Sequence, residues 1–96
     1  MGLYVLLVRM TEQGKRHIQE ALEKREKVME FIKKEGGNPQ TVLMTFGRYD
    51  VIEILELPSD EVAMKLSIKG AETGDVSIET LRAFTVDEMQ SLVSSL

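Results

Sequence analysis

Residues 38–57, NPQTVLMTFGRYDVIEILEL, decide the fold. Through the first half of this stretch, apolar and polar side chains alternate, which predicts a strand over 38–46 with Phe46 as its last inward residue. Gly47 tolerates a positive φ, so the GRYD segment is expected to reverse the chain. The second half is almost wholly apolar and predicts another strand over 51–57. The stretch therefore predicts two neighbouring antiparallel strands.

A helix is expected on each side of this hairpin. Before it, apolar residues recur at helical spacing over 11–35, with Thr11 as the N-cap and a Gly-Gly pair after the last turn. After it, Ser59 is expected to cap a second helix, which the GAETGD segment at 70–75 ends. The two helices thus flank the hairpin in the chain.

Two further strands and a final helix complete the order. The run 3–8 is apolar at every position, as in a strand buried on both faces, and 76–84 reads as a fourth strand. Thr85 and Glu88 have the spacing of a capping box, which predicts a short C-terminal helix. The order β-α-β-β-α-β is that of an α+β, ferredoxin-like fold with a four-stranded antiparallel sheet. Right-handed crossovers place the first and third strands in its middle.

The face of this sheet without helices should be exposed to solvent, but the residues predicted to lie on it are apolar. Two helices cover only one face of such a sheet, and the other face normally carries polar side chains. In the first strand both faces are apolar: Leu3, Val5 and Leu7 on one, and Tyr4, Leu6 and Val8 on the other. The C-terminal helix could cover part of the second face, and a second copy of the sheet would cover it better. We therefore expect a homodimer through sheet faces, with higher assembly open.

Length and composition limit the protein class. The chain has 96 residues, so we expect one domain over 1–96. Its net charge of −4 argues against a nucleic-acid partner, and its first apolar run is too short for a membrane helix. It has no cysteine and a single histidine, His17, so we expect no metal site and no cofactor. These features predict a soluble, cytoplasmic protein without a membrane partner.

Arg25 is the most unusual residue, because it lies at the centre of the apolar stripe of the long helix. A buried guanidinium needs a carboxylate, carbonyl groups or a bound anion. Asp50, Glu53 and Glu56 are candidate partners on the third strand. Two interpretations stay open: a structural ion pair, or a cationic group that lines a cavity between helix and sheet.

Other candidate groups lie around the third strand. Tyr49 and Asp50 could form the edge of a pocket, or Asp50 could cap the hairpin while Tyr49 packs. Glu53 and Glu56 are three residues apart, so they lie on opposite faces and are not a matched catalytic pair. Each could instead neutralise an arginine, such as Arg25, Arg9 or Arg82.

Several of these segments together resemble the GYD domain family. The resemblance rests on YVLLVRMTEQG at 4–14, FGRYDVIEILELP at 46–58, ETLRAFTVDE at 79–88 and the Arg25 position. It covers nearly the whole chain, and the family takes its name from the residues seen here as Gly47, Tyr49 and Asp50. The resemblance implies a dimeric α+β barrel and brings no settled activity with it. The matching positions are Thr11, Gly14, Arg25, Gly47, Tyr49, Asp50, Glu56, Ala83 and Phe84.

Three functions stay open at this point. The first is an oligomeric domain that binds a small anionic or polar molecule through Arg25, Tyr49, Asp50 and Glu56. The second is a cofactor-independent enzyme of the monooxygenase or isomerase type, with Asp50 or Glu56 as base and Arg25 stabilising negative charge. The third is a purely structural or interaction module.

Overall fold

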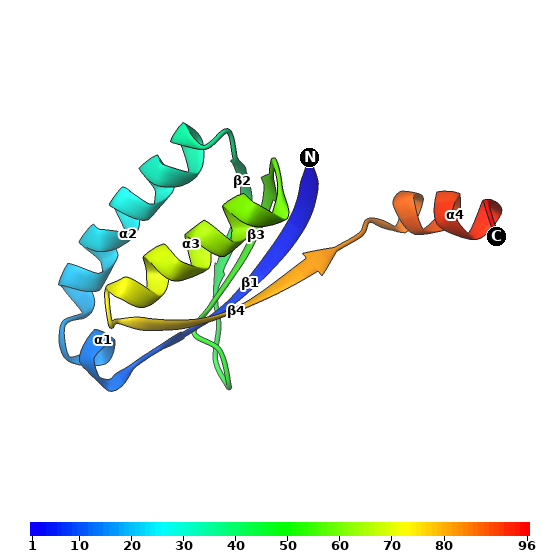
Figure 1. The fold of residues 1–96 in the computed structure, drawn as a ribbon. Coiled ribbons are helices and arrows are strands. Elements are labelled where there is room, and N and C mark those ends of the chain that lie inside the picture. The colour runs from blue at the N-terminus through cyan, green and yellow to red at the C-terminus, as the bar shows by residue number, and fades with distance from the viewer.

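The computed structural model describes residues 1–96 and shows one antiparallel sheet of four strands (Figure 1). The strands are β1 (Gly2–Met10), β2 (Asn38–Met44), β3 (Val51–Leu57) and β4 (Val76–Ala83). They lie in the order β2-β3-β1-β4, so the first and third strands are central, as the sequence predicts. The α+β, ferredoxin-like fold is therefore confirmed.

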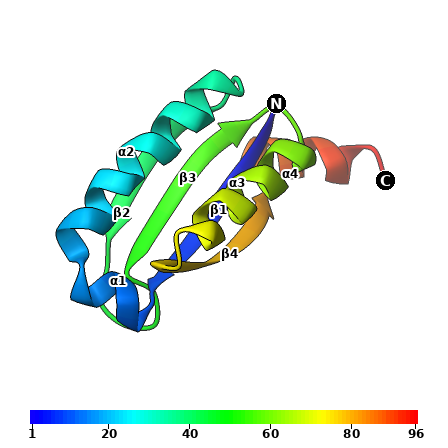
Figure 2. The same cartoon turned by 60° about the vertical axis from the view of Figure 1, so that its left-hand side comes forward.

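Four helices accompany the sheet: α1 (Glu12–Arg16), α2 (Ile18–Lys34), α3 (Asp60–Glu72) and α4 (Val86–Ser94). α2 and α3 lie side by side over one face of the sheet, and α1 sits at one end of it (Figures 1 and 2). α4 follows β4 and projects away from the rest of the chain (Figure 1). None of these helices combines the length and apolar character needed to cross a bilayer.

The core lies between the two covering helices and the sheet. Its nine buried side chains are Tyr4, Leu6, Val8, Ile32, Leu55, Leu57, Val62, Ala63 and Leu66. In β1 the buried positions alternate with half-buried ones, because successive strand residues point to opposite faces. Removal of these apolar side chains from water holds the helices on the sheet.

The prediction of one continuous helix over 11–35 is wrong, because the chain bends at His17 (φ −127°, ψ 48°). The cause is the way α1 is attached. The amide of Thr11 donates to the carbonyl oxygen of Asp75, and Gly14 lies so close to Asp75 that a Cβ atom there would be 2.2 Å from the same oxygen. α1 is thus fixed to the turn before β4, while α2 follows the sheet.

The prediction for Phe46 is also wrong. β2 ends at Met44, and Phe46 lies in the hairpin loop with its side chain fully exposed. The loop closes one residue earlier, where the amide of Thr45 donates to the carbonyl oxygen of Asp50 (2.9 Å). Gly47 takes φ +97°, as expected for the turn.

The second face of the sheet has no cover from its own chain. We call it the open sheet face, and its apolar residues are Leu3, Val5, Leu7, Leu43, Ile52, Ile54 and Leu81. All seven are half-buried or exposed, whereas the β1 residues between them are buried. α4 does not pack on this face, so the expected partial cover by the C-terminal helix is not found.

Candidate functional site

Arg25 pairs with Glu53 on the helix side of the sheet. One guanidinium nitrogen, Nη2, donates to Oε1 of the Glu53 carboxylate. Glu53 faces the helices because it is the cross-strand partner of Leu6, a core residue. The side chains of Arg25 and Glu53 are 27% and 13% exposed, so both charges are largely removed from water. Of the three candidate carboxylates, Glu53 is the partner.

The space beside this pair is narrow. A crevice runs between α2 and the strands β2 and β3, with Met29, Ile32 and Glu53 among its lining residues. It has no room for a water-sized molecule. The geometry therefore favours the structural ion pair over a cationic group that lines a ligand cavity.

Asp50 has a structural role in the hairpin. Its carboxylate Oδ2 accepts a hydrogen bond from the amide of Met10 (2.7 Å), and its own amide donates to the carbonyl oxygen of Val8 (2.8 Å). These bonds continue the contact between β1 and the start of β3. They match the interpretation of Asp50 as the residue that caps the hairpin.

Glu56 lies on the open side of the sheet, near the far end of β3 from Asp50. The side-chain amide of Gln40 donates to its Oε1 atom. Neither Arg9 nor Arg82 pairs with it. Arg82 instead lies over the ring of Tyr4, with its guanidinium carbon 5.4 Å from the ring centre.

Tyr49 belongs to a polar group that we call the Tyr49 cluster: Arg9, Arg48, Tyr49 and Glu79. The Tyr49 hydroxyl donates to Oε2 of Glu79 (2.6 Å). The guanidinium carbon of Arg9 lies 5.7 Å from the ring centre, and its Nε atom donates to the carbonyl oxygen of Arg48 (3.0 Å). The hydrogen bond to the Glu79 carboxylate raises the pKa of the Tyr49 hydroxyl above its ordinary value, because the nearby negative charge favours the protonated form.

The Tyr49 cluster lies at one end of the open sheet face. Glu79 is the cross-strand partner of Leu7, and Arg9 stands two residues further along β1 on the same face. Arg9 and Arg48 are exposed, and neither forms an ion pair. The cluster thus holds two guanidinium groups and one carboxylate, so its net charge suits an anion.

The four predicted site residues do not share one pocket. Arg25 is on the helix side, Glu56 is at the far end of β3, and only Tyr49 and Asp50 are neighbours. Arg9, Arg48 and Glu79 were not predicted as site residues. The register of β1 against β4 places Glu79 within reach of Tyr49, and the sequence pattern does not contain that register.

No curated protein matches this chain. The family model described as GYD domain matches residues 4–93, which is nearly the full length and includes every member of the Tyr49 cluster. The chain therefore belongs to the GYD domain family.

Proposed function

We propose that this protein is a self-associating domain that binds a small anionic molecule at the Tyr49 cluster. One observation carries the proposal: the guanidinium groups of Arg9 and Arg48, neither of which has a carboxylate partner, lie beside Tyr49 at the end of an uncovered apolar sheet face. Small-molecule sites are mostly apolar and hold a few polar groups that fix the orientation of the ligand. The Tyr49 cluster and its apolar neighbours have this composition.

Self-association supplies the apolar part of the site. The open sheet face presents seven apolar side chains to water, and packing a second sheet against them would remove this surface from water. Two sheets pack face to face at about 10 Å, with their side chains interdigitated. In a two-fold dimer the Tyr49 cluster of each copy would lie at the rim of the space between the sheets.

The charges suggest the class of ligand. An exposed guanidinium binds carboxylate or phosphate oxygens through paired N–H donors. Leu7 and Ile52 are cross-strand partners beside the cluster, and they favour an apolar body behind the charged group. A small carboxylate with an aromatic or aliphatic body fits both requirements. Arg25 is not part of this site, because Glu53 already neutralises it.

Thermal unfolding with sodium acetate, butyrate and benzoate at constant ionic strength tests the ligand site. A ligand that binds only the folded chain raises Tm as its concentration increases. We expect benzoate to raise Tm more than acetate does, because only benzoate adds apolar contact. We expect Arg9→Gln to abolish most of this shift.

Arg16→Gln is the matched control. Arg16 is an exposed arginine of α1 whose partner is Glu12, and it is absent from the Tyr49 cluster. The proposal expects the Arg16→Gln variant to keep the benzoate shift. Equal shifts in both variants, or no shift in the unmodified protein, would reject the anion site.

A further inference from the structure

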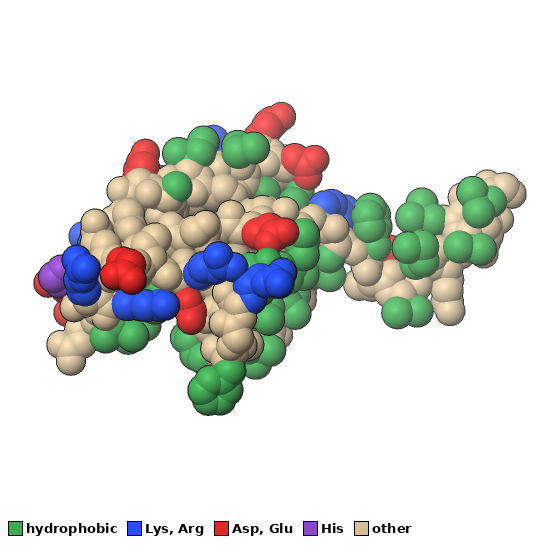
Figure 3. Space-filling model, turned by 90° about the horizontal axis from the view of Figure 1, so that it is seen from below, with side chains coloured by type: hydrophobic (Ala, Val, Ile, Leu, Met, Phe, Trp, Pro, Cys, Tyr) green, Lys and Arg blue, Asp and Glu red, His purple; other side chains and the backbone are tan.

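α4 carries an apolar side that no other helix or strand of the chain covers. Val86, Met89, Leu92 and Val93 point to one side of this helix, and between 50% and 74% of each residue's surface is exposed. Figure 3 shows hydrophobic side chains gathered over this projecting helix. No residue of α4 is buried. An amphipathic helix of this kind needs a surface to cover its apolar side.

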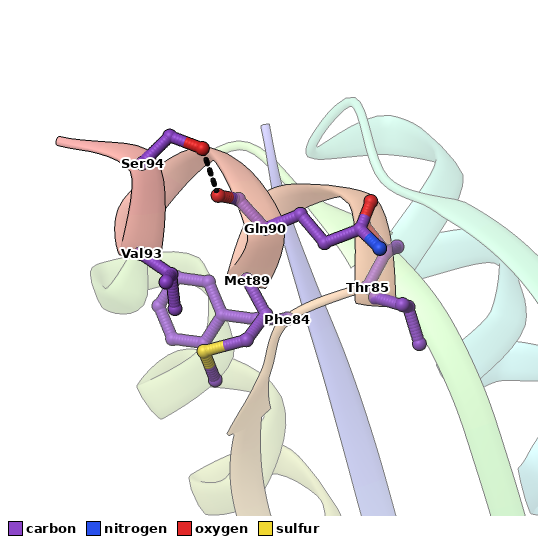
Figure 4. A pocket seen from close by; sticks show the side chains of 7 residues that line it. Phe84, Thr85, Met89, Gln90, Val93 and Ser94 are labelled. Atoms are coloured by element: carbon purple, nitrogen blue, oxygen red, sulfur yellow. Dashed lines mark hydrogen bonds between the residues drawn. The ribbon is translucent and has the colours of Figure 1, made fainter.

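The length of α4 makes the same point. It has nine residues, and isolated helices shorter than about 12–15 residues are marginal in water. The only apolar residue from outside α4 at this side is Phe84, which gathers with Met89 and Val93 at a shallow groove along the helix (Figure 4). We therefore expect the helix to be held by contacts outside its own chain.

The direction of α4 is fixed where it leaves the sheet. Thr85 and Glu88 form a capping box, and the hydrogen bonds of Thr85 to the Glu88 carboxylate lower the pKa of Glu88. The guanidinium carbon of Arg82 lies 4.6 Å from the ring centre of Phe84. Nη1 of Arg82 also donates hydrogen bonds to the carbonyl oxygens of Leu3 (3.2 Å) and Ala83. These contacts hold the helix away from its own sheet.

We infer that α4 is an arm that docks on a second copy of this chain. The inference rests on the self-association proposed above. The same chain leaves two apolar surfaces uncovered, the arm and the open sheet face, and β4 connects them: Leu81 lies on the open sheet face, and Phe84 follows the last residue of the strand. A two-fold pair of copies covers both surfaces at once, and each arm extends past its own sheet to reach the partner.

The apolar area supports a joint interface. The arm exposes Phe84, Val86, Met89, Leu92, Val93 and Leu96. An apolar side chain accounts for roughly 60–120 Å² when fully exposed, so these six present on the order of 300 Å². A stable dimer buries about 800 Å² on each partner. The arm alone is too small for a stable dimer, and the seven side chains of the open sheet face have to provide the remainder.

A substitution on the arm tests the inference by sedimentation equilibrium. Met89→Lys places a charge on the apolar side, and we expect it to raise the dimer Kd about 100-fold, roughly 10-fold for each of the two arms. Ser91→Lys is the matched control, because Ser91 lies on the opposite side of the same helix and receives the same charge. The control should keep the Kd of the unmodified protein. Equal Kd values for the two variants would overturn the proposal that the arm docks on a second copy.

A second measurement locates the arm directly. The chain has no cysteine, so a nitroxide spin label attached to the Ser95→Cys variant modifies this one position alone. Mixing this protein with unlabelled, ¹⁵N-enriched copies restricts paramagnetic broadening to contacts between chains. We expect broadening at partner residues of α4 and at one edge of the partner's open sheet face.

The outcomes distinguish the docking of the arm from dimerisation itself. An unmodified protein that sediments as a monomer would overturn self-association and, with it, the docking of the arm. A dimer without broadening in the ¹⁵N-enriched copy would overturn only the docking of the arm. Broadening only at partner residues of α2 or α3 would also overturn it, because these helices lie on the other side of the sheet.

Discussion

At the scale of single residues, Arg25 shows which part of the site can be predicted. Its place in the apolar stripe is visible in the sequence, because helical periodicity is a local property. The sequence also requires a partner for the buried charge. The choice of Glu53 over Asp50 and Glu56 depends on which face of β3 meets the helices, and the pairing with β1 sets that face.

Replacement of Arg25 tests the structural ion pair. Arg25→Met leaves the Glu53 carboxylate, only 13% exposed, without its partner. We expect the free energy of unfolding to fall by about 1–2 kcal/mol, less than for a fully buried pair, because water still reaches Arg25. Urea unfolding measures this change.

The second replacement in the pair supplies the control. Adding Glu53→Met should restore most of the lost stability, because an apolar pair of similar volume can replace an ion pair. If the two substitutions lowered stability additively, the pair would make no coupled contribution and the structural interpretation would be wrong.

Tyr49 shows the limit of prediction at this scale. The sequence places it correctly beside the turn, since Gly47 and the apolar runs around it are local signals. Its hydrogen-bond partner, Glu79, is 30 residues away on β4. No local pattern connects the two, so this contact emerges only with the sheet.

At the scale of elements, a buried carboxylate joins the helices to the turn before β4. Asp75 is 3% exposed and accepts hydrogen bonds from Nζ of Lys24 on α2 and from Nε2 of Gln13 on α1, both at 3.0 Å. The hydrogen bond from Lys24, followed by that from Gln13, lowers the pKa of Asp75. The segment 70–75 is visible in the sequence as a helix end, but its role as an anchor for α1 and α2 is not.

The pH dependence of stability tests this anchor. Because its folded pKa lies below the unfolded value of about 3.9, the Asp75 carboxylate stabilises the fold above that value. The stabilisation is lost as the pH falls through the folded pKa. We expect Asp75→Asn to reduce the free energy of unfolding at pH 7, and we expect this difference from the unmodified protein to shrink toward pH 3.

Urea unfolding of both proteins at several pH values measures the effect. Comparing the two proteins at each pH removes the contribution of the other acidic residues. A difference that stays constant from pH 7 to pH 3 would show that the charge of Asp75 has no part in the anchor.

Helix starts were predictable, whereas the bend in the long helix was not. Thr11, Ser59 and Thr85 each cap the predicted helix, because a cap needs only the residues that follow it. The bend at His17 results from the contact of Gly14 with the Asp75 backbone, which joins distant parts of the chain. Phe46 was misplaced for a related reason: the hydrogen bond that closes the loop ended the strand early.

At the scale of the whole molecule, uncovered apolar surface is the dominant feature. The buried core lies on one side of the sheet, while the open sheet face and the arm are exposed. The sequence predicts the first of these surfaces through the apolar run of β1. It does not predict the projection of α4, because the direction of a helix after a strand depends on contacts such as that between Arg82 and Phe84.

The most direct test of self-association is sedimentation velocity at micromolar concentration. We would compare the unmodified protein with Val5→Lys, in the middle of the open sheet face between Ile54 and Leu81, and with Gln19→Lys, an exposed α2 residue given the same charge. Circular dichroism would confirm that each variant keeps its fold. We predict a dimer of twice 10.8 kDa for the unmodified protein and Gln19→Lys, and a monomer for Val5→Lys. A monomer for the unmodified protein, or an intact dimer for Val5→Lys, would contradict association through the open sheet face.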